Sequence, residues 1–195
     1  MLRLWDLLKP IREALIPSRP AARPAPARAP ASPGRRAKPA APRRGDPAPG
    51  SMQARYDAMV AEMLTKYGIK VRKWRKNSLG IARLTHFRDG TITRTLESPR
   101  PTGPMSAAIF LHEVGHHAIG FEVYKPRCLE EYHAWAFAVR EMERLGLNVT
   151  DSVRLRMHRS LKYAIDKARR RGLRDLPPEL APFDAAPPRR ARRRG

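Results

Sequence analysis

Apolar residues recur at helical spacing near the start of the region between the two Pro- and Arg-rich ends of the chain. They fall three or four positions apart in one stretch: Tyr56, Met59, Val60, Met63, Leu64 and Tyr67. This period predicts an amphipathic helix. Ser51 is suited to cap its beginning, and Gly68 to end it.

The period changes after Gly68. The segment "IKVRKW", residues 69–74, predicts a strand, and residues 81–97 predict a hairpin whose turn contains "RDG". The alternation of apolar and polar residues is imperfect. We therefore expect a small antiparallel sheet with uncertain strand boundaries.

Three further helices are predicted after the sheet, at about residues 105–120, 128–145 and 151–171. Gly146 closes the second, Thr150 or Asp151 caps the third, and Gly172 stops it. An order of helix, small sheet and three helices predicts a compact α+β fold.

Composition limits this folded domain to residues 51–176. Residues 17–50 are almost entirely Pro, Ala, Arg, Gly and Ser, without large apolar side chains, and predict a disordered linker. Residues 177–195 predict a disordered basic tail. Residues 1–16 predict a short amphipathic helix that docks on a partner, a membrane surface or the chain's own domain, and we favour the partner.

The formal net charge of +22 is shared by both arms and the domain. Such a charge favours contact with nucleic acid or an acidic surface, although basic residues are often only solvated. No apolar run reaches the length of about 20 residues that crosses a membrane. The single cysteine, Cys128, excludes an internal disulfide framework and suits a reducing, cytoplasmic compartment.

The segment "HEVGH", residues 112–116, carries the candidate chemistry. His112 and His116 are one helical turn apart, so both imidazoles can reach a single tetrahedral Zn²⁺ ion. Glu113 follows the first histidine directly, which places its carboxylate beside the metal ion rather than on it. There it could take a proton from a bound water molecule.

A third protein ligand is needed, and the sequence offers several candidates nearby. Glu131 ranks first, because it shares a helical stripe with Ala134, Trp135, Ala138, Met142 and Leu145 that should face the HExxH helix. The remaining candidates, in order, are Glu130, His133 and Glu122. Helical phase allows at most one of Glu131 and His133 to face the metal ion.

The segments "HEVGHH" and "EEYHAWAFA" resemble the gluzincin-type zincins, in particular the small ImmA/IrrE-like metallopeptidases, over residues 51–146. Ala134, Phe137 and Ala138 match the family's "A-x-x-F-A" pattern. Two features depart from it: only 14 residues separate His116 from Glu131, and His133 stands where a second acidic residue is common.

The resemblance implies a zinc-dependent peptidase with a protein or peptide substrate. It assigns His112, His116 and Glu131 as zinc ligands and Glu113 as general base. Candidates to stabilise the oxyanion are His117, Tyr124, Tyr132 and His133, and the 81–97 hairpin is a candidate platform for an extended substrate. The alternative is a basic nucleic-acid- or partner-binding protein with a structural or inactive zinc site.

Other residues have simpler explanations. His86 and His158 are expected at the surface or in structural roles. Trp74, among basic residues, is more readily explained by packing than by stacking on a base. Arg154, Arg156, Arg159 and Lys162 flank an apolar line of Val153, Met157, Leu161 and Ile165, and face either phosphates or solvent.

Overall fold

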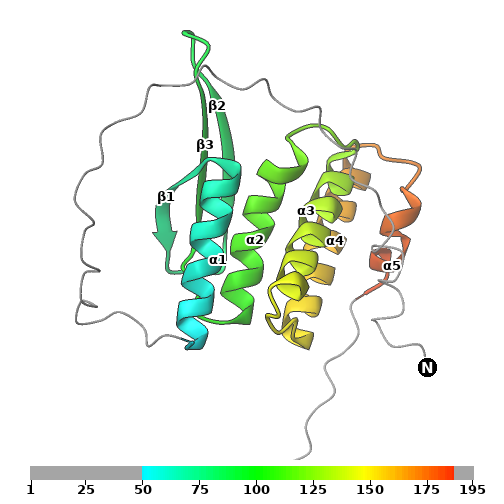
Figure 1. Ribbon diagram of the computed structural model, residues 1–195. Coiled ribbons are helices and arrows are strands. Elements are labelled where there is room, and N and C mark those ends of the chain that lie inside the picture. Colours follow the sequence, from blue (N-terminus) through cyan, green and yellow to red (C-terminus); the bar gives the residue numbers. More distant parts are fainter. Residues whose placement is uncertain (1–49, 187–195) are drawn as a thin grey trace, which may run out of the picture. The chain divides into compact units, whose positions relative to one another are not determined.

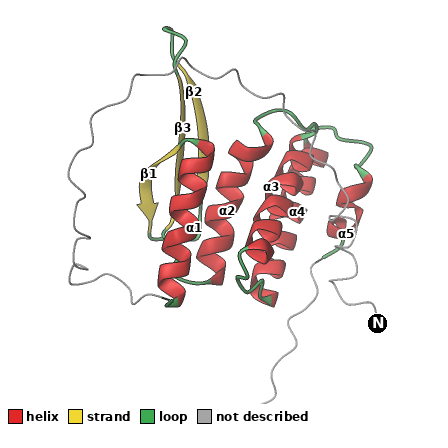
Figure 2. Ribbon diagram, in the orientation of Figure 1, coloured by secondary structure: helices red, strands yellow, loops and turns green. Residues whose placement is uncertain are grey.

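The computed structural model describes residues 50–186, and the helix expected at 1–16, almost all of the linker and residues 187–195 lie outside this range. The described chain forms the α+β fold that the sequence predicts (Figures 1 and 2). In order, its elements are α1 (Met52–Tyr67), β1 (Ile69–Arg75), β2 (Ile81–His86), β3 (Ile92–Pro99), α2 (Pro104–Ile119), α3 (Arg127–Arg144), α4 (Asp151–Arg170), the 3₁₀ turn η2 (Pro178–Leu180) and α5 (Ala181–Asp184).

Local signals set the ends of the helices as expected. The Ser51 hydroxyl accepts a hydrogen bond of 3.1 Å from the Ala54 amide at the start of α1, and Gly68 ends that helix with φ 62°. Thr150, rather than Asp151, caps α4, because its hydroxyl accepts from the Val153 amide at 3.3 Å.

The sheet is mixed, which corrects the expected antiparallel sheet. Its strand order is β1-β3-β2, with β3 parallel to β1 and antiparallel to β2. The central β3 is the most buried of the three strands, and Leu96 lies opposite both Val71 of β1 and Ala82 of β2. Backbone groups of a buried strand cannot bond to water, so the most buried strand is stabilised most by hydrogen bonds to a strand on each side. β2 is therefore left at an edge of the sheet.

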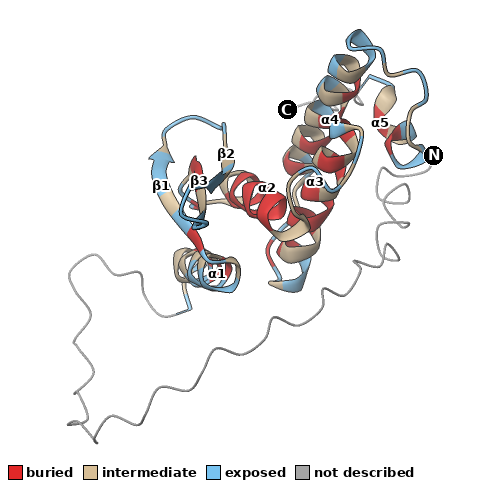
Figure 3. Ribbon diagram, turned by 90° about the horizontal axis from the view of Figure 1, so that it is seen from above, coloured by how far each residue is buried: buried red, intermediate tan, exposed pale blue. Residues whose placement is uncertain are grey.

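Helix α2 lies at the centre of the fold, between the sheet on one side and α3 and α4 on the other (Figures 1 and 3). Every residue from 107 to 117 is buried, which explains why apolar residues occur all around this helix. The polar residues of the HExxH segment are therefore placed in the interior of the protein rather than on its surface.

Gly115 allows α2 and α3 to approach closely. A Cβ atom at this position would lie 2.7 Å from the carbonyl oxygen of Ala134 and 3.1 Å from its Cα. Both are backbone atoms, so no side-chain rotation could relieve the contact. Because Gly115 stands between His112 and His116, the close approach brings both histidines towards α3.

The folded region continues beyond residue 176, so the expected start of a disordered tail at 177 was too early. Leu180 and Phe183 are buried, and the Phe183 ring contacts the rings of Tyr132 and His158. Arg169 of α4 also binds both carboxylate oxygens of Asp184, at 2.6 and 2.7 Å. Two apolar residues spaced three apart and this ion pair dock the short segment on α3 and α4. Among the helices of the described range, none is long and apolar enough to cross a membrane.

We expect Gly115→Ala to destabilise the protein. An alanine in an open helical position stabilises by about 1 kcal/mol relative to glycine, whereas overpacking a core costs about 1–3 kcal/mol. Contact with the Ala134 backbone should therefore give a net loss, measured as a lower free energy of unfolding in urea. A gain in stability would contradict the close helix contact.

Candidate metal centre

Helix α2 presents three polar side chains next to one cleft. His112, Glu113 and His116 are 8%, 6% and 5% exposed, and the two imidazole rings have their centres 4.8 Å apart. Buried polar groups of this kind require partners. The partners come from α3 and from the edge strand β2.

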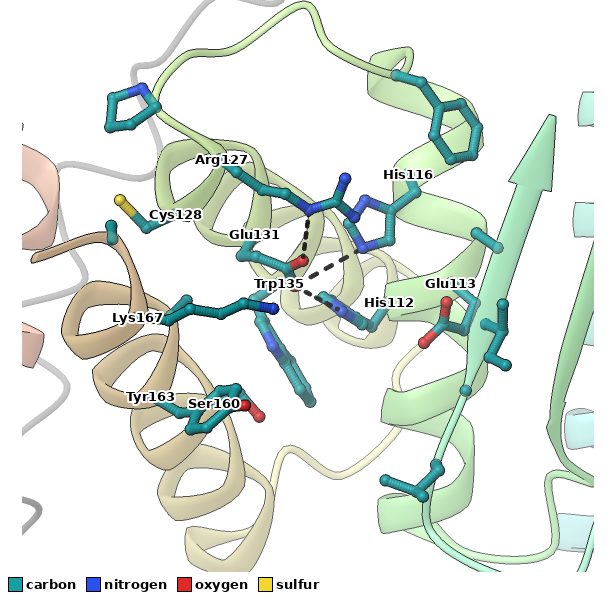
Figure 4. Close-up of a pocket in the computed structure, with 18 of the residues that line it drawn as sticks. His112, Glu113, His116, Arg127, Cys128, Glu131, Trp135, Ser160, Tyr163 and Lys167 are labelled. Atoms are coloured by element: carbon teal, nitrogen blue, oxygen red, sulfur yellow. Dashed lines mark ion pairs between the residues drawn. The ribbon is translucent and has the colours of Figure 1, made fainter. Parts of the chain in front are cut away.

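Glu131 of α3 approaches both histidines from the opposite side (Figure 4). Its Oε2 atom lies 3.4 Å from Nε2 of His112 and 3.7 Å from Nε2 of His116. The possible ligand atoms of these three residues all lie within 4.8 Å of one another. Atoms at the corners of a tetrahedron about 2.0–2.2 Å from a central Zn²⁺ are about 3.3–3.6 Å apart. The distance of 3.4 Å lies within this range and that of 3.7 Å lies just above it, so a shared zinc ion needs only a small movement of the side chains.

The other candidates for the third ligand lie elsewhere. Glu130 faces the far side of the His116 ring, and its Oε1 accepts a hydrogen bond of 3.2 Å from Nδ1. Its Oε2 accepts a second hydrogen bond of 3.1 Å from the amide of Glu122, whose side chain is exposed. His133 stacks on Tyr124, with ring centres 3.8 Å apart. Of the four carboxylate or imidazole candidates, the structure groups Glu131 with His112 and His116.

The two histidines are oriented by different contacts. The Glu130 carboxylate accepts from Nδ1 of His116, which turns Nε2 of the same ring towards Glu131. His112 instead stacks on Trp135, with ring centres 4.5 Å apart and planes at 25°. Within residues 50–186, Nδ1 of His112 has no hydrogen-bond partner. Packing on Trp135 and the contact of Nε2 with Glu131 therefore hold the first imidazole in place.

Glu113 lies on the side of the cluster next to the beginning of β2 (Figure 4). It fills the space above Gly80, where a Cβ atom would come within 2.2 Å of its Oε1. Burial is the main reason that the pKa of Glu113 is raised, to about 7, although a hydrogen bond from the Ala82 amide opposes this shift. Glu113 is thus a buried carboxyl group next to the metal-binding cluster but outside it.

The electrostatics of two of the three cluster residues, His112 and Glu131, suit a bound cation. Burial lowers the pKa of His112, which favours the neutral form. Burial acts against the charged form of Glu131 as well, but its contact with His112 and the charge of His116 hold its pKa below the usual value. For His116, burial lowers the pKa, but the hydrogen bond with Glu130 and the charges of Glu131, Glu113 and Glu130 together outweigh it, so its pKa is raised and a bound metal ion would have to displace a proton. A neutral imidazole beside an ionised carboxylate is the state that metal binding requires.

The cluster opens into a cleft of about 720 Å³. Residues 79–82, at the start of β2, form one wall, and the cluster lies between this wall and α4. Helix α4 contributes a stripe of mostly polar side chains: Arg156, Ser160, Tyr163, Lys167 and Arg171. The cleft therefore has room for a substrate between an edge strand and a basic helix.

The sequence analysis did not predict that polar side chains of α4 would line the cleft. None of the expected oxyanion-stabilising residues, His117, Tyr124, Tyr132 and His133, lines the cleft. His117, for example, is turned towards the sheet, with Nε2 3.1 Å from the carbonyl oxygen of Thr95. The signal that could have identified α4 is the recurrence of polar residues every three or four positions from 156 to 171.

The remaining singled-out residues have structural roles or lie on the surface. The Trp74 ring is 38% exposed and lies 6.2 Å from the Phe110 ring, which supports packing rather than stacking on a base. His86 is exposed, and His158 is buried against Phe183. The apolar line of α4, from Val153 to Ile165, is buried as expected.

Comparisons with known proteins leave the site to be interpreted from its own geometry. The scan against protein-family models found no match, and the searches of curated proteins and of solved structures found no significant similarity. What the structure shows is a buried His-His-Glu cluster on two packed helices that could hold a metal ion.

Proposed function

We propose that the protein is a zinc-dependent peptidase, with His112, His116 and Glu131 as metal ligands and Glu113 as general base. The observation that carries this proposal is the convergence of both Nε2 atoms on the Glu131 carboxylate, while the Glu113 carboxylate stays free beside them. Structural zinc sites in proteins use four protein ligands, whereas catalytic sites use three and keep one position open. Three ligands facing a cleft favour catalysis over a purely structural site.

Different residues of the chain carry out different parts of the hydrolysis. A zinc ion bound at this cluster would lower the pKa of a water molecule towards about 7 and polarise a peptide carbonyl. Glu113 takes the proton from the attacking water and delivers it to the leaving amine nitrogen. Glu130 and Trp135 hold the two imidazoles in the orientation that binding requires.

The edge strand β2 is suited to bind the substrate backbone. It pairs with β3 on one side only, and residues 79–82 at its start line the cleft next to Glu113. An extended peptide can pair with such an edge through main-chain hydrogen bonds. This position supports the hairpin as the substrate platform and would place a peptide bond between β2 and the metal centre.

The first prediction of this proposal concerns metal content. We expect about one zinc ion per purified chain, lost in His116→Ala and in Glu131→Ala. The exposed residues His86 and Glu143 provide matched controls, because His86→Ala and Glu143→Ala should retain the metal ion. Elemental analysis measures the stoichiometry. Zinc that persists in both ligand variants would contradict the proposed site.

The second prediction separates catalysis from metal binding. Glu113→Gln should keep its zinc, because Glu113 is not a ligand, and should lose peptide hydrolysis by a factor of about 10²–10⁴. Cleavage of a degenerate peptide pool, followed by mass spectrometry, measures the activity. Full activity in Glu113→Gln would contradict the assignment of Glu113 as general base.

The third prediction concerns the residue behind His116. Glu130 accepts two hydrogen bonds through its two carboxylate oxygens, and a glutamine has only one acceptor oxygen. Glu130→Gln should therefore weaken zinc affinity about 10–100-fold, the usual effect of removing a group that orients a ligand. Competition with a chromophoric chelator measures the affinity. Glu143→Gln, on the exposed side of the same helix, should leave it unchanged.

A further inference from the structure

Within residues 50–186, every charged side chain that lines the cleft is positive, apart from the candidate metal cluster and Glu113. Arg127 comes from α3, and Arg156, Lys167 and Arg171 come from α4 or its end. The acidic residues that line the cleft are Glu113 and Glu131, both part of the candidate site. A substrate that fills the cleft therefore meets positive charge on the side opposite β2.

The four cations are not equally available. Arg156 donates a hydrogen bond of 3.1 Å to the carbonyl oxygen of Ser78, and Nε of Arg127 lies 3.8 Å from the Glu131 carboxylate. Lys167 and Arg171 are exposed and have no ion-pair partner within residues 50–186. Lys167 extends from α4 into the cleft, towards the metal cluster (Figure 4). Positions 167 and 171 are one helical turn apart, so both can contact the same ligand.

Helix dipoles do not account for this arrangement. Cations at the end of α4 are favourable in general, but Arg169 and Arg170 supply that effect without lining the cleft. Arg127 stands at the beginning of α3, where a positive charge is unfavourable for the helix dipole. The four cations therefore share their position around the cleft and not a favourable position in a helix dipole.

We propose that the cleft selects a peptide segment with acidic side chains, which Lys167 and Arg171 bind. This inference rests on the proposed peptidase function and names its class of substrate. A peptide fits better than a nucleic acid, because β2 offers main-chain hydrogen bonds to an extended peptide backbone on the opposite wall.

The test compares two double variants of the full chain. Lys167→Gln with Arg171→Gln removes two charges from the cleft, and Arg159→Gln with Arg170→Gln removes two exposed charges of α4 that do not line it. Both variants keep the same net charge and the same basic arms, so non-specific attraction is matched. The probes are two degenerate pools of short peptides with a fixed Glu-Glu or Gln-Gln pair, and a short single-stranded oligonucleotide.

Binding is measured by fluorescence anisotropy in the Glu113→Gln background, which prevents turnover. We expect the cleft variant to lose about three- to tenfold of the preference for the Glu-Glu pool over the Gln-Gln pool, and the control variant to keep it. The preference should fall as salt rises. An equal loss in both double variants, or no loss in either, would overturn the proposal. So would a larger loss of oligonucleotide binding than of Glu-Glu binding in the cleft variant.

Cleavage of the two pools by the zinc-loaded protein distinguishes the two proposals. A Glu-Glu preference in binding without cleavage of either pool would contradict the peptidase function and leave the acidic specificity in place. Cleavage of both pools at equal rates, with equal binding, would support the peptidase function and reject the acidic specificity.

Discussion

The close contact between α2 and α3 is the constraint on which the site depends. Gly115 brings the backbone of α2 against Ala134, and this contact fixes the distance between the imidazoles of one helix and the Glu131 carboxylate of the other. Glu131 precedes Ala134 by about one helical turn, so the position of this contact also sets where the Glu131 carboxylate lies along the axis of α3. A cluster built on two rigid helices is held more accurately than one built on loops.

Placing this cluster on the most buried helix of the fold has a cost in stability. Removing ionisable groups from water is unfavourable unless each finds a partner, and α2 buries His112, Glu113, His116 and His117 within six residues. Glu130, the Thr95 carbonyl and the Ala82 amide each supply one hydrogen-bond partner, to His116, His117 and Glu113 respectively. A bound cation would add a partner for Nε2 of His112 and for the Glu131 carboxylate, so metal binding should raise folding stability.

Local signals in the sequence were sufficient for much of this structure. Ser51, Gly68 and Thr150 act at helix ends through short-range hydrogen bonds or backbone conformation, and their effects can be read from neighbouring residues. The grouping of Glu131 with the histidines followed from helical phase, because the stripe from Ala134 to Met142 does face α2.

Non-local contacts limited the prediction elsewhere. Whether β1 pairs with β2 or β3 depends on which strand is buried by helices far away in the sequence, so the mixed sheet was not foreseen. The docking of Phe183 and the position of Lys167 in the cleft also depend on how α4 packs against the rest of the domain. The polar stripe of α4 looks like an ordinary solvated face until the cleft opposite it is known.

The two hydrogen bonds of Glu130 connect the His-His-Glu cluster to the loop between α2 and α3. One carboxylate oxygen holds His116, and the other holds the amide of Glu122, a residue with the unusual φ of 61°. Phe121 and Pro126 of the same loop line the cleft. Loop shape and ligand orientation are thus coupled through a single side chain, and thermodynamic coupling is reciprocal. A substrate that shifts the loop would change the affinity for the metal ion, and loading the metal ion would change, by the same factor, how strongly the loop retains that substrate.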